Sequence, residues 1–206
     1  MSHKVICIGR QFGSGGFLIG KALSEKLGIP FYDKNIIALA SERSGLSPET
    51  LEKGDERKTS QWFYMGMTDV TGATLASPPP SDVTYALQRD IILDAAKEHD
   101  CIIVGRCSDA ILHQTDAKVL SVFISAPFED RVKRRMHEEA LDEKTTIALV
   151  KKNDKRRKAY YNFNTGLEWG APENYDLCLN SSSLPYEEIA EIIIDFLHRR
   201  LKDGKN

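Results

Sequence analysis

The chain has 206 residues, which is enough for one compact domain with a substantial hydrophobic core. Its formal net charge of −2 gives no reason to expect bulk attraction to nucleic acid or to a membrane surface. No apolar run approaches the roughly 20 residues that a transmembrane helix needs, and the first residues show no signal-peptide pattern. We therefore expect a cytoplasmic protein that binds neither nucleic acid nor membranes.

The cysteines share no CxxC spacing. Cys7, Cys101 and Cys178 lie in apolar, strand-like runs, where reduced and buried thiols are the ordinary expectation. The cysteine pattern therefore predicts no zinc site.

The first predicted elements are a strand at 5–8, a glycine-dense turn and an amphipathic helix at 17–27. Glycines allow the turn to direct its backbone N–H groups inward, and the positive end of the helix dipole adds to the attraction for an anion. A tight turn without any ligand is the simpler alternative. We favour a phosphate cradle, whose expected contacts with the donor nucleotide are Gly13, Ser14, Gly15, Gly16, Phe17 and Leu18.

The turn departs from a regular Walker A motif. In that motif, Gly, four residues and then Gly-Lys-Ser/Thr supply a lysine for the β- and γ-phosphates and a hydroxyl for Mg²⁺. The span from Gly9 to Gly16 is one residue too long. If Gly15 is the second motif glycine, Gly16 takes the place of the lysine, and neither Phe17 nor Leu18 supplies a hydroxyl. The backbone part of the cradle is present, and its two side chains are absent.

A short strand at 31–32 and a helix at 34–43 follow, and Ser47 is the predicted N-cap of another helix. From 54 to 82 the pattern weakens, which fits either a partly irregular insert or a solvated loop anchored by a few aromatic residues. The remaining elements are predicted as a helix at 81–98, strands at 101–104, 119–124 and 175–180, and helices at 127–139, 142–161 and 185–201. Strands that alternate with helices predict an α/β fold with a mostly parallel sheet covered on both faces. In such a sheet, ligands bind beyond the carboxyl ends of the strands.

Positive charge is concentrated between Arg131 and Lys158, where eleven Lys and Arg stand against five Asp and Glu. This concentration fits closure over a polyphosphate, since phosphoryl transfer depends mostly on positioning and on neutralisation of the phosphate oxygens. A solvated helix face is the alternative, and the charge run alone favours neither. Within the run, Asp154 either orients Arg157 or pairs with a neighbour three or four residues away on its own helix.

Two charged residues directly follow predicted strands. Arg106 comes after the third strand, beside the expected phosphate site. The alternative is a salt bridge at the strand end, with Asp109 as a candidate partner. Asp33 comes after the second strand. We expect a carboxylate there to contact a sugar hydroxyl, a base amino group or a metal-bound water. Its alternative role is the N-cap of the next helix.

Several segments, in order and over nearly the whole chain, resemble the cytidylate kinases and, more closely, their cytidylate kinase-like relatives. The matching segments lie at 9–16, 27–33, 103–107, 131–136, 153–157 and 175–182. The resemblance implies a P-loop nucleoside monophosphate (NMP) kinase fold, with a five-stranded parallel sheet flanked by helices in a single domain. It also implies an NMP-binding insert at about 54–80 and a basic, helical lid at about 131–174, with the core at 1–53, 81–130 and 175–206.

By position, the resemblance implies an acceptor site made of side chains from separate elements. Arg106 and Arg131 look like arginines that hold the substrate phosphate, and Arg134 belongs to the same basic helix as Arg131. Asp33 follows the second strand, where the family places substrate contacts. We take these four residues as candidate substrate ligands.

The candidate catalytic residues are Arg157, Asp154 and Arg10. Arg157 looks like a lid arginine that bridges the two phosphates, and Asp154 precedes it on the same predicted helix. The family's kinases carry Lys and Thr in the turn where this chain has Gly16 and Leu18. Arg10 is the nearest positive side chain that could replace the missing lysine.

The resemblance implies ATP-dependent phosphoryl transfer to an NMP, of the CMP or dCMP kind, with Mg²⁺ held largely by phosphates and water. Nucleotide substrates are the expected partners, and the sequence leaves the oligomeric state open. The alternative is a catalytically weak or inactive nucleotide-binding protein that regulates through lid closure, because the lysine and the hydroxyl are absent.

Overall fold

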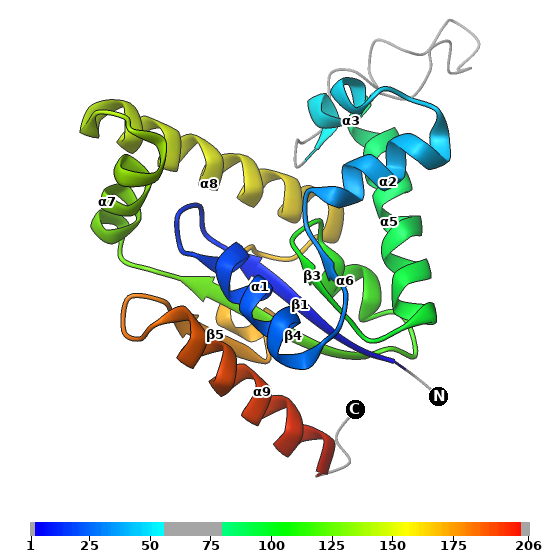
Figure 1. Cartoon of the computed structure of the whole chain (residues 1–206). Helices are drawn as coiled ribbons and strands as arrows, with labels where there is room; N and C mark the ends of the chain where they lie inside the picture. Colours follow the sequence, from blue (N-terminus) through cyan, green and yellow to red (C-terminus); the bar gives the residue numbers. More distant parts are fainter. Residues whose placement is uncertain (1–2, 56–79, 203–206) are drawn as a thin grey trace, which may run out of the picture.

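The computed structural model describes residues 3–55 and 80–202. Its centre is a parallel sheet with the strand order β2-β3-β1-β4-β5 (Figure 1). The strands are β1 (Lys4–Arg10), β2 (Phe31–Tyr32), β3 (Cys101–Val104), β4 (Lys118–Ser125) and β5 (Leu177–Asn180). The predicted five-stranded parallel sheet is therefore confirmed. Most of the expected insert, from 56 to 79, lies outside the described residues.

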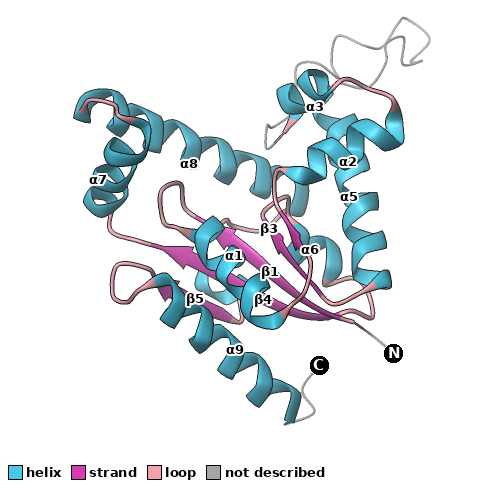
Figure 2. Ribbon diagram, viewed as in Figure 1, coloured by secondary structure: helices cyan, strands magenta, loops and turns pink. Residues whose placement is uncertain are grey.

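Helices flank this sheet (Figure 2). They are α1 (Gly16–Leu27), α2 (Asn35–Ser44), α3 (Pro48–Gly54), α5 (Pro80–Glu98), α6 (Ser108–Leu112), α7 (Phe128–Glu139), α8 (Glu143–Thr165) and α9 (Tyr186–Lys202), with a 3-10 turn η1 (Pro172–Asn174). The predicted helices are confirmed, and α8 continues beyond its expected end at 161. No periodicity in the sequence signals α6, because its five residues are too few for a helical pattern.

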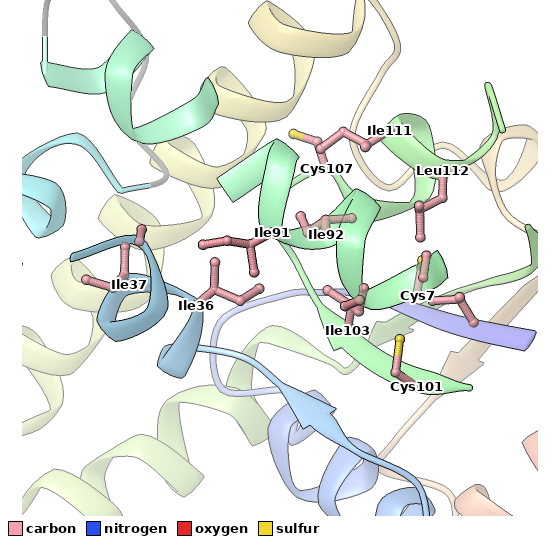
Figure 3. Packing of buried hydrophobic residues seen from close by; sticks show 14 of the residues in the cluster. Cys7, Ile36, Ile37, Ile91, Ile92, Cys101, Ile103, Cys107, Ile111 and Leu112 are labelled. Atoms are coloured by element: carbon pink, nitrogen blue, oxygen red, sulfur yellow. The ribbon is translucent and has the colours of Figure 1, made fainter. Parts of the chain in front are cut away.

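The central strand β1 is covered on both faces. Val5 and Cys7 pack on the side of α2, α5 and α6, whereas Ile6 and Ile8 pack on the side of α1 and α9. Each of the four side chains is at most 1% exposed, and full burial of an Ile or Val contributes about 1.5–3 kcal/mol. Figure 3 shows the first of these clusters, with Cys7 among labelled residues of the surrounding helices. This burial fixes the strand from which the glycine loop emerges.

The edge strand β5 is covered on one face. Leu177 and Leu179 pack with the cluster that contains α9, whereas Cys178, between them, points away and is exposed. The expectation of a buried Cys178 is wrong because successive side chains of a strand face opposite sides and this strand has only one covered side. Cys7 and Cys101 are buried, as expected.

Two helices, α7 and α8, pack against each other and reach the loop between β1 and α1 (Figure 1). All of α8 and all but the first turn of α7 lie in the basic segment at about 131–174. Residues from both helices hydrogen-bond to the glycine loop, so the segment is joined to the carboxyl end of the sheet. None of the helices in the described ranges combines the length and the apolar composition of a membrane span.

Candidate functional site

The loop between β1 and α1 has the geometry of an anion cradle. Gly13 and Gly15 adopt left-handed backbone angles, with φ of 79° and 78°, which favour glycine at both positions. Gly15 is the N-cap of α1 and carries no side chain that could cap the helix. The N–H groups of the first helical turn have no intrahelical acceptor, so they can bind an anion there.

Hydrogen bonds within the chain fix this loop. The Ser14 hydroxyl donates to the Gln11 carbonyl at 2.9 Å, and the Ser181 hydroxyl donates to the Ser14 carbonyl at 2.6 Å. The Gln11 side-chain oxygen accepts the N–H of Ala126 at 3.1 Å, which ties the loop to the end of β4. Ser14 is fully buried, so it supports the cradle from behind.

Two arginines of the basic segment donate to main-chain carbonyls of the same loop. Nη1 of Arg134 lies 2.5 Å from the carbonyl oxygen of Gly13, and Nη1 of Arg157 lies 3.2 Å from that of Arg10. Arg134 also lies over the ring of Tyr186, with 5.3 Å between the guanidinium carbon and the ring centroid. A carbonyl accepts a hydrogen bond without carrying a formal charge, so these bonds position the two guanidiniums beside the loop.

Asp154 joins α8 to both α7 and the loop. Its Oδ1 accepts the N–H of Phe12 at 2.8 Å, and its Oδ2 accepts Nη1 of Arg131 at 2.6 Å. Arg131 is buried and also donates to the Phe12 carbonyl at 3.0 Å. The expected pairing of Asp154 with Arg157, or with a neighbour on its own helix, is therefore wrong, because the carboxylate points toward α7 and the loop.

A second cluster lies where β2 and β3 end. Nη1 of Arg106 donates to Oδ1 of Asp33 at 2.8 Å, and Nε and Nη2 donate to the two oxygens of Asp55 at 3.2 and 2.8 Å. Arg106 therefore forms a salt bridge at the strand end, as the alternative interpretation held. Its partners are these two carboxylates and not Asp109, which accepts the hydroxyl of Tyr161 at 2.6 Å.

Asp33 lies between two guanidiniums. Its Oδ1 is 3.6 Å from Nη2 of Arg10 and 2.8 Å from Nη1 of Arg106. The alternative role of Asp33 as an N-cap is wrong, because α2 has Lys34 at the cap position and no side-chain cap hydrogen bond. The carboxylate instead faces the strand ends, where the sequence predicted a ligand site.

Sequence reasoning missed Asp55 and Gln88. Nε2 of Gln88 donates to Oδ1 of Asp55 at 2.8 Å, and its Oε1 accepts the hydroxyl of Tyr160 at 3.2 Å. Gln88 is fully buried in α5. No spacing in the sequence connects either residue with Arg106, so only the packing of α3 and α5 against the sheet reveals them.

Arg10 occupies the room that a side chain at position 16 would need. A Cβ atom built on Gly16 would lie 2.7 Å from Cβ and 3.1 Å from Cγ of Arg10. Real Cβ contacts are not that short, so a lysine at 16 and Arg10 in its present position exclude each other. The position of Arg10 in this structure therefore requires a residue without a side chain at 16, where a Walker A motif has its lysine.

These features line a cleft of about 670 Å³. It brings together most of the predicted site residues, namely Arg10, Gly13, Gly15, Gly16, Phe17, Leu18, Asp33, Arg134 and Arg157. Ser14, Arg106, Arg131 and Asp154 support its walls through the hydrogen bonds described above. Phe17 and Leu18 are 47% and 42% exposed. Phe17 packs edge-on against Phe31 with centroids 5.4 Å apart, so this part of the cleft is apolar.

The sequence did not single out Phe12, at the tip of the loop. The centroid of its ring lies 4.5 Å from the guanidinium carbon of Arg135 and 5.6 Å from that of Arg157. Cation–π contacts of this kind contribute about 0.5–2 kcal/mol. An aromatic residue within a glycine-rich turn was the available signal. The ring connects the loop to α7 and α8.

A family model described as the cytidylate kinase-like family matches residues 5–183. The matched span includes the glycine loop, the cluster at the strand ends and both helices of the basic segment. The chain belongs to the cytidylate kinase-like family.

Solved structures resemble this cytidylate kinase-like protein over nearly its whole length. An uncharacterized protein from Eubacterium ventriosum is 29% identical with a TM-score of 0.69, covering 95% of this chain and 99% of that one. A gluconokinase from Sinorhizobium meliloti is 16% identical with a TM-score of 0.60 and coverages of 97% and 94%. An APS kinase from Mycobacterium tuberculosis, in complex with AMPPNP and APS, is 15% identical with a TM-score of 0.53 and coverages of 96% and 98%. At these low identities, the last two matches show a shared P-loop kinase fold.

Among curated proteins, a uronate isomerase from Corynebacterium glutamicum is 30% identical over 142 residues, or 66% of this chain. The chain spans only about a quarter, 26%, of the length of that relative, so the match concerns a segment of it. The cytidylate kinase-like family and the P-loop kinase fold together support kinase activity toward a nucleotide or another small molecule.

Proposed function

We propose that the protein transfers the γ-phosphoryl group of ATP to a nucleoside monophosphate, with CMP and dCMP as the first acceptors to test. The observation that carries the proposal is the gathering of arginines from three elements around one glycine cradle. They are Arg10 of β1, Arg134 and Arg135 of α7, and Arg157 of α8. Phosphoryl transfer is accelerated mostly by positioning and by neutralisation of the phosphate oxygens, and arginine forks do both.

The donor phosphates bind at the loop in this proposal. Backbone N–H groups of residues 13–16 hold the β- and γ-phosphates, and Arg10 supplies the positive charge that a P-loop lysine otherwise supplies. Arg157 neutralises the transferred group from the side of α8. Mg²⁺, when bound, neutralises charge on the phosphates. Phe17 and Leu18 would offer it no side-chain oxygen, so phosphate oxygens and water would supply most of its ligands.

The acceptor binds at the other end of the cleft in this proposal, beside Asp33. That carboxylate lies next to the guanidiniums of Arg10 and Arg106. A monophosphate there is close to the arginine that the family resemblance assigns to it. The acceptor oxygen then approaches the γ-phosphate from the side opposite to the ADP leaving group, as an in-line displacement requires.

Nucleotide binding with little or no turnover is the second candidate function. The observation that favours it is the apolar surface of Phe17 and Leu18 at the start of α1, where kinases of the family have a hydroxyl. Loss of a catalytic arginine at a phosphoryl-transfer site costs about 10³–10⁵ in rate. A protein without the lysine is therefore inactive unless Arg10 replaces it.

A coupled ADP-release assay tests the proposal, with ATP, Mg²⁺ and each of CMP, dCMP, UMP and AMP. Equilibrium binding of ATP is measured in parallel. We expect turnover on at least one acceptor, above the ATPase rate without acceptor. A mock purification from host cells that do not express the chain is the control for contaminating kinases and must show no such activity. Tight ATP binding without turnover on any acceptor would support the second candidate, and absence of ATP binding would refute both.

A further inference from the structure

The guanidinium of Arg106 already holds anionic groups of its own chain. Nε and Nη2 donate to the carboxylate of Asp55, and Nη1 donates both to Asp33 and, at 3.3 Å, to the carbonyl of Val104. The Arg106 side chain is 2% exposed. The arginine expected to bind an acceptor phosphate is thus occupied by two carboxylates.

The two carboxylates differ in how firmly they are held. Asp33 is 8% exposed and is flanked by Arg10 as well as Arg106. Asp55 is 20% exposed, directly follows the last residue of α3, and is held in addition by Gln88. Asp55 returns to water at a smaller cost because it is already partly exposed. It also contacts Arg106 with both oxygens, in the geometry that an incoming phosphate would need.

We propose that Asp55 sets an affinity threshold for the acceptor by occupying the guanidinium of Arg106 as an internal competitor of the acceptor's anionic group. An acceptor gains Arg106 only when it displaces Asp55. This inference rests on the proposed function, since it takes this end of the cleft as the acceptor site. It adds that an anion must bind Arg106 more strongly than the chain's own carboxylate does.

The selectivity follows from the charge of the two competing groups. A ligand carboxylate that replaces Asp55 exchanges one singly charged, bidentate group for another. The interaction energy of the Arg106 guanidinium therefore does not improve. A phosphate monoester carries about −1.5 to −2 charges at pH 7 and three acceptor oxygens. It therefore forms stronger charge-assisted hydrogen bonds with the same fork. Asp55 lowers the apparent affinity of both classes by the same factor, so that the weaker-binding carboxylates fail to displace it whereas phosphate monoesters succeed.

Asp55→Asn and Asp55→Ser test the proposal, because both remove the competing charge and keep a small polar side chain. Glu52→Gln is the matched control, since Glu52 is an exposed carboxylate of the same helix α3. For each protein, KM and kcat are measured for CMP, or for the acceptor that the panel identifies. Binding of inorganic phosphate and of acetate, without nucleotide, is measured by calorimetry. A thermal melt confirms that each variant is folded.

We expect both Asp55 variants to lower the KM for the acceptor by about three- to tenfold, because an internal competitor reduces apparent affinity by the fraction of free sites. The kcat should stay within about twofold of wild type, since the competitor is absent from the occupied site. Binding of acetate and of inorganic phosphate should strengthen by the same factor, because one internal competitor lowers the apparent affinity of every anion equally. Glu52→Gln should match wild type in every measurement.

An unchanged or higher KM in both Asp55 variants, with normal melts, would overturn the proposal and make Asp55 a residue that merely positions Arg106. An equal effect of Glu52→Gln would also overturn it, by showing a general effect of charge. If no acceptor is turned over, the proposed function fails. Binding of inorganic phosphate and of acetate to the Asp55 variants, compared with wild type, still decides the role of Asp55 in that case.

Discussion

The two ends of the cleft use arginine differently. At the glycine loop, Arg134 and Arg157 donate to main-chain carbonyls, which carry no formal charge. At the ends of β2 and β3, Arg106 is matched by the carboxylates of Asp33 and Asp55. The loop end therefore positions these two arginines through main-chain carbonyls, whereas the strand end pairs its arginine with two carboxylates of the chain.

The two ends of the cleft therefore differ in what an incoming anion must displace. At the loop end, main-chain carbonyls and not the acceptor position Arg134 and Arg157, so we expect nucleotide binding there not to depend on the acceptor. An anion reaches Arg106 only in exchange for a carboxylate, so the strand end selects the second substrate. Substitutions at the loop should change the rate of transfer most, and substitutions at the strand end should change acceptor affinity.

The largest effect is expected from Arg10→Ala, which removes the positive charge at the place of the P-loop lysine. Phosphoryl transfer should slow by about 10³-fold, within the range for loss of a phosphate-binding arginine. The Kd for ATP should change less, because charge on the transferred group develops in the transition state. Arg10→Lys should recover part of the rate. Lys21→Ala is the control, because Lys21 is exposed on α1 and pairs with Glu25. A rate for Arg10→Ala within threefold of wild type would exclude Arg10 as the replacement of the lysine.

Gly16→Lys tests whether the loop is a degraded Walker A motif or works in its own geometry. A side chain at 16 would come within 2.7 Å of Arg10, so we expect this substitution to displace Arg10 and to slow transfer by about 10–100-fold. The double variant Arg10→Gly/Gly16→Lys should be faster than Gly16→Lys alone, because glycine at 10 removes both the Cβ and the Cγ that a side chain at 16 would meet. Gly16→Ala is the control for steric displacement without added charge. Faster transfer by Gly16→Lys alone would show a degraded motif.

Asp154→Asn tests how the loop is fixed. Its carboxylate pairs with Arg131, whose side chain is 6% exposed, so the substitution leaves a buried guanidinium without its anion. We expect a loss of about 2 kcal/mol in the free energy of unfolding, somewhat less than for a fully buried pair. The Kd for ATP should rise by about tenfold, because the N–H of Phe12 also loses a charged acceptor. Urea unfolding and ATP titration measure both effects. Glu143→Gln, on the exposed first turn of the same helix, should alter neither substantially.

The sequence predicted the fold and the loop end of the cleft because the signals for both are local. The strand at 5–8, the glycines and the helix that follows are contiguous, and the apolar residues of β1 are buried on alternate sides by helices of both faces. The chemistry of Gly16 and Arg10 was visible only in part. The sequence shows that the lysine is missing. The steric exclusion between positions 10 and 16 becomes evident only from the folded loop, which brings the two residues together.

The strand end could not be predicted in the same way, because its contacts join distant parts of the chain. Asp55 meets Arg106 across 51 positions, and Asp154 meets Phe12 across 142. Sequence spacing identifies partners within one helix or one turn. Spacing does not identify a carboxylate such as Asp55 or Asp154, which contacts a residue far away in the sequence only after the chain has folded. Asp109, three residues from Arg106 in the sequence, was therefore a reasonable candidate for its salt-bridge partner, but this prediction is wrong.

The smallest effect is expected from Asp109→Asn, behind the strand end. Burial raises the pKa of the Asp109 carboxyl above its ordinary value of 3.8, and the hydrogen bond from Tyr161 only partly opposes this. The native protein then holds this proton to a higher pH than the unfolded chain does. Wild type should accordingly lose stability as pH rises through this interval, and recover it as pH falls below 3.8. Asn cannot ionise and still offers Tyr161 an acceptor oxygen, so Asp109→Asn should remove this contribution, as urea unfolding at a series of pH values would show. An unchanged pH dependence of the free energy of unfolding in Asp109→Asn would show that the Asp109 carboxyl does not cause this loss of stability.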